Sequence, residues 1–182
     1  DFFGATYSLN YSTKNTDIIL GGAANRYLGN HFGEVVWTQY YIPSQNRYYN
    51  NFGNKDDVNF YGKASQQFGK LNVFADLQYR MVFYKANSTK FDEVNDTFRF
   101  FNPKAGVTYT LNKNNSIYGY FGIANKEPRR DDYENSAAKP ERLFDYELGW
   151  KYVKSKIKVN VNAFFTCKYR RAWEKISVFK IL

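Results

Sequence analysis

The feature of this sequence that most restricts its fold is an alternation of apolar and polar side chains with a period of two residues. In the stretch 71–83, the odd positions carry Leu, Val, Ala, Leu, Tyr, Met and Phe, and most even positions are polar. Successive side chains of a β-strand point to opposite faces, whereas a helix would mix the two sets. The same alternation recurs near 2–11, 104–111, 144–152 and 156–165. The pattern predicts an all-β, antiparallel fold.

Strand and turn signals together predict about eight main strands and two kinds of connection. The long connections fall at 23–56, 87–96 and 126–141, and the first is expected to contain an aromatic extension at 31–42. Short turns on one rim and long loops on the other are typical of outer-membrane barrels. The predicted strands lie near 2–11, 16–22, 57–68, 71–86, 97–111, 116–125, 142–153 and 156–165.

Two classes of β protein fit this pattern, and strand length favours one of them. A soluble barrel or sandwich would turn its apolar face inward and its polar face to water. The predicted strands exceed the roughly 5–6 residues common in soluble sheets and reach the roughly 9–11 needed to cross a bilayer at a tilt. Their polar faces are rich in Asn, Gln, Thr, Ser and Lys, as expected for a water-filled lumen. We therefore expect a transmembrane β-barrel segment.

Composition argues against several functional classes. Of the net charge of +9, the tail 166–182 carries +4 and the remaining +5 is scattered over the other 165 residues, which predicts a solvated basic surface and no nucleic-acid partner. One histidine, His31, and one cysteine, Cys167, provide neither a His-based metal site nor a disulfide. Asp145 and Glu147 share one strand face, and we expect them to pair with lysines such as Lys151, Lys156 and Lys158 and not to act as a catalytic pair. Neither an enzyme, a metal site nor a cofactor is predicted.

The segment 166–182 departs from the alternation. Its sequence, TCKYRRAWEKISVFKIL, places several aromatic and apolar residues near helical spacing. One interpretation is a basic amphipathic helix at a membrane surface. The other is an atypical tail, from a truncation or a shifted reading frame, that does not belong to the fold. The predicted organisation is therefore a partial barrel at 1–165 followed by a separate tail at 166–182.

A family resemblance follows from the order of several short motifs. The stretch IYGYFGIANKEPRRDDY ends a predicted strand, KPERLFDYELGWKY begins the next, and NVNAFF stands in the strand after that. This order resembles the late barrel of TonB-dependent outer-membrane receptors, in which an Asn/Arg-Glu-Pro-x-Arg-x-Asp-Tyr-like loop precedes a Lys-Pro-Glu and a strand with Glu-Leu-Gly. The stretch NRYLGNHFGEVVW is similar to receptors of this type from Bacteroides-like bacteria. The matching residues are Glu127, Pro128, Arg130, Asp132, Tyr133, Lys139, Pro140, Glu141, Glu147, Leu148 and Gly149.

The resemblance implies a nutrient transporter in the bacterial outer membrane. Such receptors have a 22-stranded barrel with an N-terminal plug, and they import iron chelates, cobalamin or glycans with energy passed through TonB. Neither a plug nor a TonB box is visible in this sequence, so we expect a middle-to-late part of the barrel. Its expected partners are outer-membrane lipid, the plug, an unknown small-molecule ligand and, through regions outside the chain, the TonB complex. A self-contained eight-stranded outer-membrane barrel with a structural or adhesive role is the alternative.

Two sets of candidate site residues follow from this interpretation. Aromatic and cationic residues of the long loop 23–56 suit a planar, anionic or sugar ligand. These candidates are Arg26, Tyr27, His31, Trp37, Tyr40, Tyr41, Arg47, Tyr48 and Tyr49. Charged residues on the polar strand faces are expected to line the lumen and to contact the plug. These are Lys63, Asp76, Arg80, Lys104, Asp145, Glu147, Lys151, Lys156 and Lys158.

Overall fold

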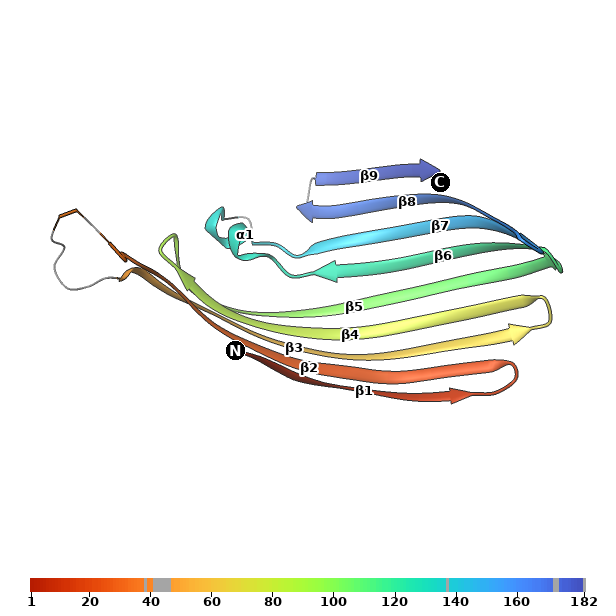
Figure 1. The fold of residues 1–182 in the computed structure, drawn as a ribbon, viewed down its shortest axis with the longest axis horizontal. Helices are drawn as coiled ribbons and strands as arrows, with labels where there is room; N and C mark the ends of the chain where they lie inside the picture. The colour runs from red at the N-terminus through yellow and green to blue at the C-terminus, as the bar shows by residue number, and fades with distance from the viewer. Residues whose placement is uncertain (38, 41–46, 137, 172–173, 182) are drawn as a thin grey trace.

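The computed structural model is a single curved antiparallel sheet in which every strand pairs with its neighbours in sequence (Figure 1). It describes residues 1–37, 39–40, 47–136, 138–171 and 174–181. These residues form nine strands and one short helix. The elements are β1 (Phe2–Ser12), β2 (Thr16–Glu34), β3 (Arg47–Phe68), β4 (Leu71–Ser88), β5 (Phe91–Asn112), β6 (Asn115–Lys126), α1 (Arg130–Glu134), β7 (Glu141–Lys154), β8 (Ile157–Arg171) and β9 (Glu174–Ile181).

The sheet is open within the described residues. Its strand order runs from β1 to β9 without a crossover, and no pairing joins the two edge strands. The all-β, antiparallel prediction is confirmed, and the described sheet is not the closed eight-stranded barrel of the alternative interpretation. An open edge leaves a row of backbone donors and acceptors unpaired, which is costly in lipid. A sheet of this kind is therefore complete only as part of a larger barrel.

The short turns gather at one rim, where four hairpins close at 13–15, 69–70, 113–114 and 155–156 (Figure 1). Gly69 adopts a left-handed φ of 58° there, a conformation that glycine reaches without a steric penalty. Ser155 has a φ of 49° in the last turn, and serine is small enough to tolerate it. We call this the short-turn rim, and the opposite end of the sheet the outer rim.

The outer rim differs from the prediction in two of its three connections. The expected loop 23–56 is mostly strand, because β2 and β3 stay paired as far as Glu34 and Arg47 and project beyond their neighbours (Figure 1). The expected loop 87–96 shrinks to a tight turn between β4 and β5. In both regions the strands continue beyond the stretches of regular apolar–polar alternation, so the periodic signal disappears although the backbone ladder does not. The third connection, 127–140, remains a loop that contains α1.

The tail is also strand and not helix. β8 continues to Arg171, and β9 pairs with it from Ala163↔Ile181 to Arg171↔Glu174. The helix interpretation of 166–182 is therefore wrong for the described residues 166–171 and 174–181. An isolated helix of this length is only marginally stable because its first turn is costly to form, whereas the edge of an existing strand offers a row of free backbone groups to pair with. Whether this segment originated by truncation or frameshift stays a prediction.

The ladder between β5 and β6 stops short of the outer rim. Pairing ends at Lys104↔Gly122, next to Pro103, which has no N–H to donate. Beyond that point the buried Asn102 side chain bridges the strands, because its Oδ1 accepts a 2.9 Å hydrogen bond from the backbone N–H of Asn125. Its Nδ2 donates to Gln78 at 3.0 Å. A side-chain amide thus replaces the backbone ladder where the strands diverge.

Candidate functional site

The pairing register divides the sheet into two faces of opposite character. One face carries large apolar side chains that stay exposed; Leu9 is 68% exposed, Leu77 51% and Leu148 69%. We call it the apolar face. The other, the polar face, carries Lys63, Arg80 and Glu147, among other charged residues. A soluble sheet buries its apolar face, so exposure of this face requires a covering such as lipid.

Four of the predicted lumenal charges lie in one lateral row of the polar face. The register joins Lys63 to Asp76, Asp76 to Lys104, and Lys104 through Gly122 to Asp145. Charge alternates along this row, and Lys104 Nζ lies 4.0 Å from Asp76 Oδ2. Alternating signs let neighbours attract instead of repel across adjacent strands. The sequence-predicted charges are therefore brought together on one surface by the strand register.

A second polar cluster centres on Tyr118, which the sequence did not single out. Its hydroxyl lies 2.6 Å from Glu147 Oε1 and 2.7 Å from Asn162 Oδ1. Lys151 Nζ lies 4.7 Å from the centre of its ring. A Cβ on Gly149 would approach the ring to 2.2 Å, so glycine at this position makes room for the aromatic side chain.

The lysine partners that we expected for the carboxylates at 145 and 147 are not those in the structure. Glu147 binds Tyr118, and Asp145 accepts a 2.8 Å hydrogen bond from Thr166. Lys158 lies on the polar face opposite Val153, but Lys156 sits in the short-turn rim and not on that face. Side chains on neighbouring strands make contact mainly at directly paired positions. The positions paired with Asp145 and Glu147 on β8 are Thr166 and Phe164, and neither is a lysine.

An electrostatic cluster at the outer rim joins β3, β4 and the loop after β6. Arg80 Nη2 is 2.5 Å from Asp57 Oδ2, and Arg80 Nη1 is 2.9 Å from Glu127 Oε2. Lys55 Nζ also bonds Glu127 Oε1. We call these four residues the rim cluster. The Glu127 side chain is 11% exposed, so its charge depends on these two cations for compensation.

Glu127 is ionised over the whole physiological range. Its burial acts to raise its pKa, but the hydrogen bond from Lys55, a backbone hydrogen bond and the hydrogen bond and charge of Arg80 together outweigh burial and lower it to about 2. The glutamate that opens the loop is therefore fixed as an anion between a lysine and an arginine. This contact anchors the start of the loop 127–136 to β3 and β4.

The rest of that loop is held by α1 and one aromatic residue. Asp132 Oδ2 accepts a 2.8 Å hydrogen bond from the Arg129 N–H, as in a capping box. Tyr133 donates to Asp96 Oδ2 at 2.6 Å and stacks on Tyr84 with a centroid distance of 5.5 Å. Burial and the hydrogen bond to Asp96 raise the pKa of Tyr133, so its hydroxyl stays a donor.

The far end of the loop is tied to the β4–β5 turn. Lys90 Nζ lies 2.9 Å from Glu134 Oε2, and Ser88 Oγ donates to the other carboxylate oxygen at 3.2 Å. The Arg130 guanidinium donates to the carbonyl of Asn87. The motif of the family resemblance thus has a structural meaning, because its Glu, Asp and Tyr side chains all make contacts that hold this loop.

The predicted ligand residues of the β2–β3 extension fall on different faces. Tyr27 and His31 share the polar face, and their Oη and Nε2 atoms are 3.4 Å apart. Arg26 belongs to the apolar face and binds Asp56 through two bonds of 2.6 and 2.7 Å. Arg47 bonds Glu34 at 2.8 Å and covers the Phe32 ring at 3.9 Å. Both arginines already have a carboxylate partner.

The aromatic candidates nearer the tip are mostly open to solvent. Trp37 is 81% exposed, Tyr40 76% and Tyr48 70%. Tyr48 and Tyr49 pack edge to face at 5.1 Å. Tyr41 lies outside the described residues. Exposed aromatic rings therefore lie close together at the end of the extension, while Arg26 and Arg47 form ion pairs with carboxylates of the neighbouring strand.

Comparison with known proteins identifies the family. The family model described as "TonB dependent receptor-like, beta-barrel" matches residues 1–169. The chain belongs to the TonB-dependent receptor β-barrel family. The resemblance drawn from the motifs is confirmed, while the finer similarity to receptors of Bacteroides-like bacteria stays a prediction. No curated protein matches the sequence.

Solved structures of this family share the fold. The FrpB iron transporter from Neisseria meningitidis (F3-3 variant) matches with a TM-score of 0.65 and 16% identity over 92% of this chain and 29% of that one. The ferric-catecholate import receptor Fiu from E. coli K12 gives 0.67 and 16% over 99% and 32%. The copper transporter OprC gives 0.69 and 16% over 92% and 29%. The chain thus spans about a third or less of these relatives.

Sequence reasoning missed several residues of the receptor wall. Lys55 and Asp57 lay in or next to a predicted loop, and their role appears only when β3 is seen to extend past them. The sequence does not distinguish Tyr118 from the other strand aromatics, although its hydroxyl contacts both Glu147 and Asn162. Gly149, which is paired with Tyr118 on the neighbouring strand, is the sequence feature that could have indicated an inward-packed tyrosine ring at this position. Among the described residues, no helix is long and apolar enough to cross a membrane.

Proposed function

We propose that this chain forms part of the barrel wall of a receptor that imports a scarce nutrient across the bacterial outer membrane. The observation that carries the proposal is the two-faced sheet, with exposed apolar side chains on one face and a register-matched row of charges on the other. The apolar face would contact lipid, and the polar face would line the lumen. Transporters and receptors, and not enzymes, make up the family.

In this proposal the polar face contacts a plug domain and borders the route of the nutrient. The alternating row from Lys63 to Asp145 and the Tyr118 cluster offer both charges and hydroxyl groups to such a domain. Energy would arrive from TonB through regions outside this chain. The proposed partners are therefore lipid, a plug, TonB and a small molecule, with no nucleic acid.

The proposed cargo is an iron chelate, cobalamin or a glycan. The exposed rings of Trp37, Tyr40 and Tyr48 suit a ligand with planar or sugar surfaces. Two of the relatives above are named for iron or a ferric catecholate, and one for copper. Because Arg26 and Arg47 are already paired, we give the aromatic residues the larger role in ligand contact.

The proposal is tested by uptake through the complete receptor that carries this segment. It would be produced in a Gram-negative host without equivalent receptors, and labelled ferric catecholate, cobalamin and oligosaccharide would be supplied with and without TonB. We expect TonB-dependent accumulation of one cargo, and a higher half-saturating concentration for the Trp37→Ala, Tyr48→Ala double variant. Surface delivery is checked by heat-modifiable migration. A correctly inserted receptor that takes up none of these compounds in a TonB-dependent way would contradict the proposal.

A further inference from the structure

The apolar face changes character near the outer rim, where basic residues replace aliphatic ones. Arg99 is paired with Met81, and Arg142 is paired with Asn125 and Tyr169, so both belong to the apolar face. Both side chains are exposed. Phe101 lies on the same face as Arg99, two residues nearer the short-turn rim, and Phe144 lies likewise below Arg142. Cations therefore border the apolar surface directly.

The two arginines lie at a similar height above the short-turn rim. Arg99 and Arg142 are roughly 13–14 residues from the turns at 113–114 and 155–156. At about 3.3 Å per residue and a tilt of about 45°, this corresponds to about 30 Å. The apolar band of an outer-membrane barrel is about 25 Å tall. Both guanidinium groups would thus stand at the level of the outer headgroups.

These two cations differ from the other cations at this level in lacking an acidic partner. Arg26 is bound to Asp56, and Lys85 Nζ lies 2.8 Å from Glu93. Arg142 donates through Nε to Asn125 Oδ1 at 2.9 Å, which leaves its two terminal nitrogens available. Within the described part of the chain, no carboxylate lies in ion-pair distance of Arg99 or Arg142. Arg99 lies on β5 and Arg142 on β7, with one strand, β6, between them.

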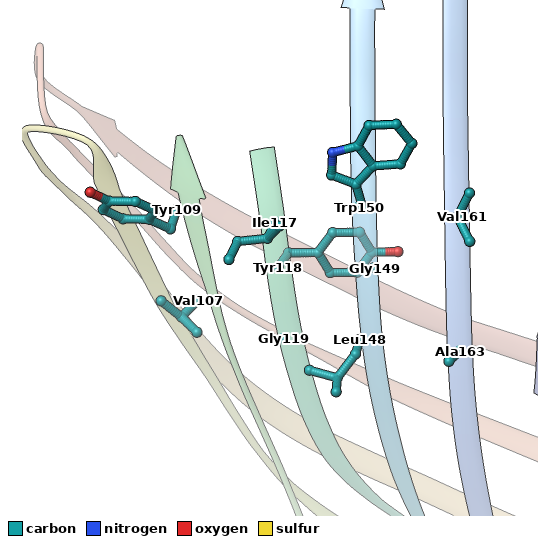
Figure 2. A pocket seen from close by; sticks show the side chains of 10 residues that line it. All are labelled: Val107, Tyr109, Ile117, Tyr118, Gly119, Leu148, Gly149, Trp150, Val161 and Ala163. Atoms are coloured by element: carbon teal, nitrogen blue, oxygen red, sulfur yellow. The ribbon is translucent and has the colours of Figure 1, made fainter. Parts of the chain in front are cut away.

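The apolar face below Arg142 is hollowed. Small residues at Ala105, Gly119 and Ala163 open a depression of about 610 Å³ between Phe121, Tyr146 and Phe165. A neighbouring depression of about 500 Å³ continues past Gly119 and is bordered by Val107, Ile117 and Leu148 (Figure 2). Leu148 lies roughly six residues along β7 from Arg142, a depth of about 15 Å at the same tilt, which is half of the hydrocarbon core.

We propose that Arg99 and Arg142 bind the phosphate-bearing headgroup of an anionic lipid of the outer leaflet, whose acyl chain occupies the hollow around Gly119. The inference rests on the proposed membrane location of this wall. Guanidinium groups bind phosphate oxygens through paired hydrogen bonds, and such bonds to charged groups are the stronger ones. The apolar hollow directly beneath the cations makes a lipid, and not a free anion, the fitting occupant.

The test measures which lipids the complete receptor retains. The receptor would be inserted into vesicles of phosphatidylcholine with bis-phosphorylated lipid A, extracted in detergent and analysed by native mass spectrometry. We expect wild type to retain lipid A in preference to phosphatidylcholine. The Arg99→Gln, Arg142→Gln variant should lose about tenfold in lipid A retention, and Arg99→Lys, Arg142→Lys should recover part of it.

The controls separate this site from general attraction between a basic protein and an anionic lipid. Lys14→Gln, Lys113→Gln removes the same charge from exposed residues of the short-turn rim, and Arg26→Gln removes a cation that has a partner. Both should change retention less than twofold. Equal losses in all variants, or no preference in wild type, would overturn the proposal. Failure of the receptor to insert into pure phosphatidylcholine vesicles would instead contradict the membrane function itself.

Discussion

The middle of the sheet and its outer rim are stabilised in different ways. In the middle, most apolar side chains lie exposed on one face, and most polar side chains lie on the other, where several pair across strands. At the outer rim, single contacts such as Arg80–Glu127 and Tyr133–Asp96 bring together segments that are far apart in the sequence. The middle therefore depends on a repeated pattern, and the rim on particular pairs.

Buried apolar side chains occur near the outer rim, where these particular contacts are made. Val82 and Ala86 are fully buried and Phe100 is 6% exposed, and all three lie on the polar face near the outer rim. Val82 and Ala86 flank Tyr84, on which Tyr133 of the loop stacks. The loop 127–136 thus contributes through Tyr133 to the region in which these three residues are buried.

The largest expected effect tests the pattern of the middle. Val161 and Asn160 are neighbours on β8 that point to the apolar and polar faces. Val161→Arg should destabilise the inserted protein by about 2 kcal/mol or more, because a cation would face hydrocarbon. Asn160→Arg, the matched control, should cost far less. Urea titration of the complete receptor in lipid vesicles measures both, and equal costs would show that the apolar face does not meet lipid.

The next effect concerns the rim cluster. Glu127→Gln leaves Arg80 with one acidic partner and Lys55 with none, so we expect a loss of about 2 kcal/mol in the stability of the loop anchor. Hydrogen exchange of backbone amides in 127–136 should rise accordingly. Glu93→Gln, which breaks the exposed pair with Lys85, is the control and should change little. If both variants behave alike, the rim does not depend on particular buried pairs.

The same contact predicts a pH dependence. The pKa of Glu127 is about 2 in the folded protein and near the ordinary value of 4.5 in the unfolded chain, so its contribution to stability is fully present above about pH 5 and is lost as pH falls toward 2. A spin label on a Lys139→Cys variant should therefore become more mobile over this interval. The transition should be absent when Glu127→Gln is added. A label whose mobility is unchanged down to pH 2 would contradict the assignment.

The smallest effect is expected for the aromatic anchor. Tyr133→Phe keeps the stacking on Tyr84 and removes only the hydrogen bond to Asp96, which should cost about 1 kcal/mol. Faster hydrogen exchange should be confined to the loop. Tyr79→Phe removes a hydroxyl from an exposed tyrosine of the apolar face and serves as control. Exchange that rises throughout β4 would show that Tyr133 supports the sheet and not the loop alone.

Sequence reasoning succeeded where a repeated pattern carried the information. Alternation predicted the strands of the middle and their two faces, and the ordered motifs predicted the family. Eight of the nine predicted lumenal charges lie on the polar face. Lys156 does not, because β8 begins at Ile157 and not at the predicted residue 156, which leaves Lys156 in the turn. Alternation failed in the outer parts of β2 and β3, which were expected to be loop, and in β9, which was expected to be a separate tail.

The sequence by itself determined the strand period, the side of the sheet on which most residues of the middle strands lie, and the family. Each follows from local order along the chain, because neighbouring residues of a strand must point in opposite directions. Only the tertiary structure decided which charges meet. Lys55, Asp57, Arg80 and Glu127 come together because three segments converge at one rim, and Glu147 binds Tyr118 because of the β6–β7 register. Such contacts depend on distances between strands, which a linear pattern does not contain.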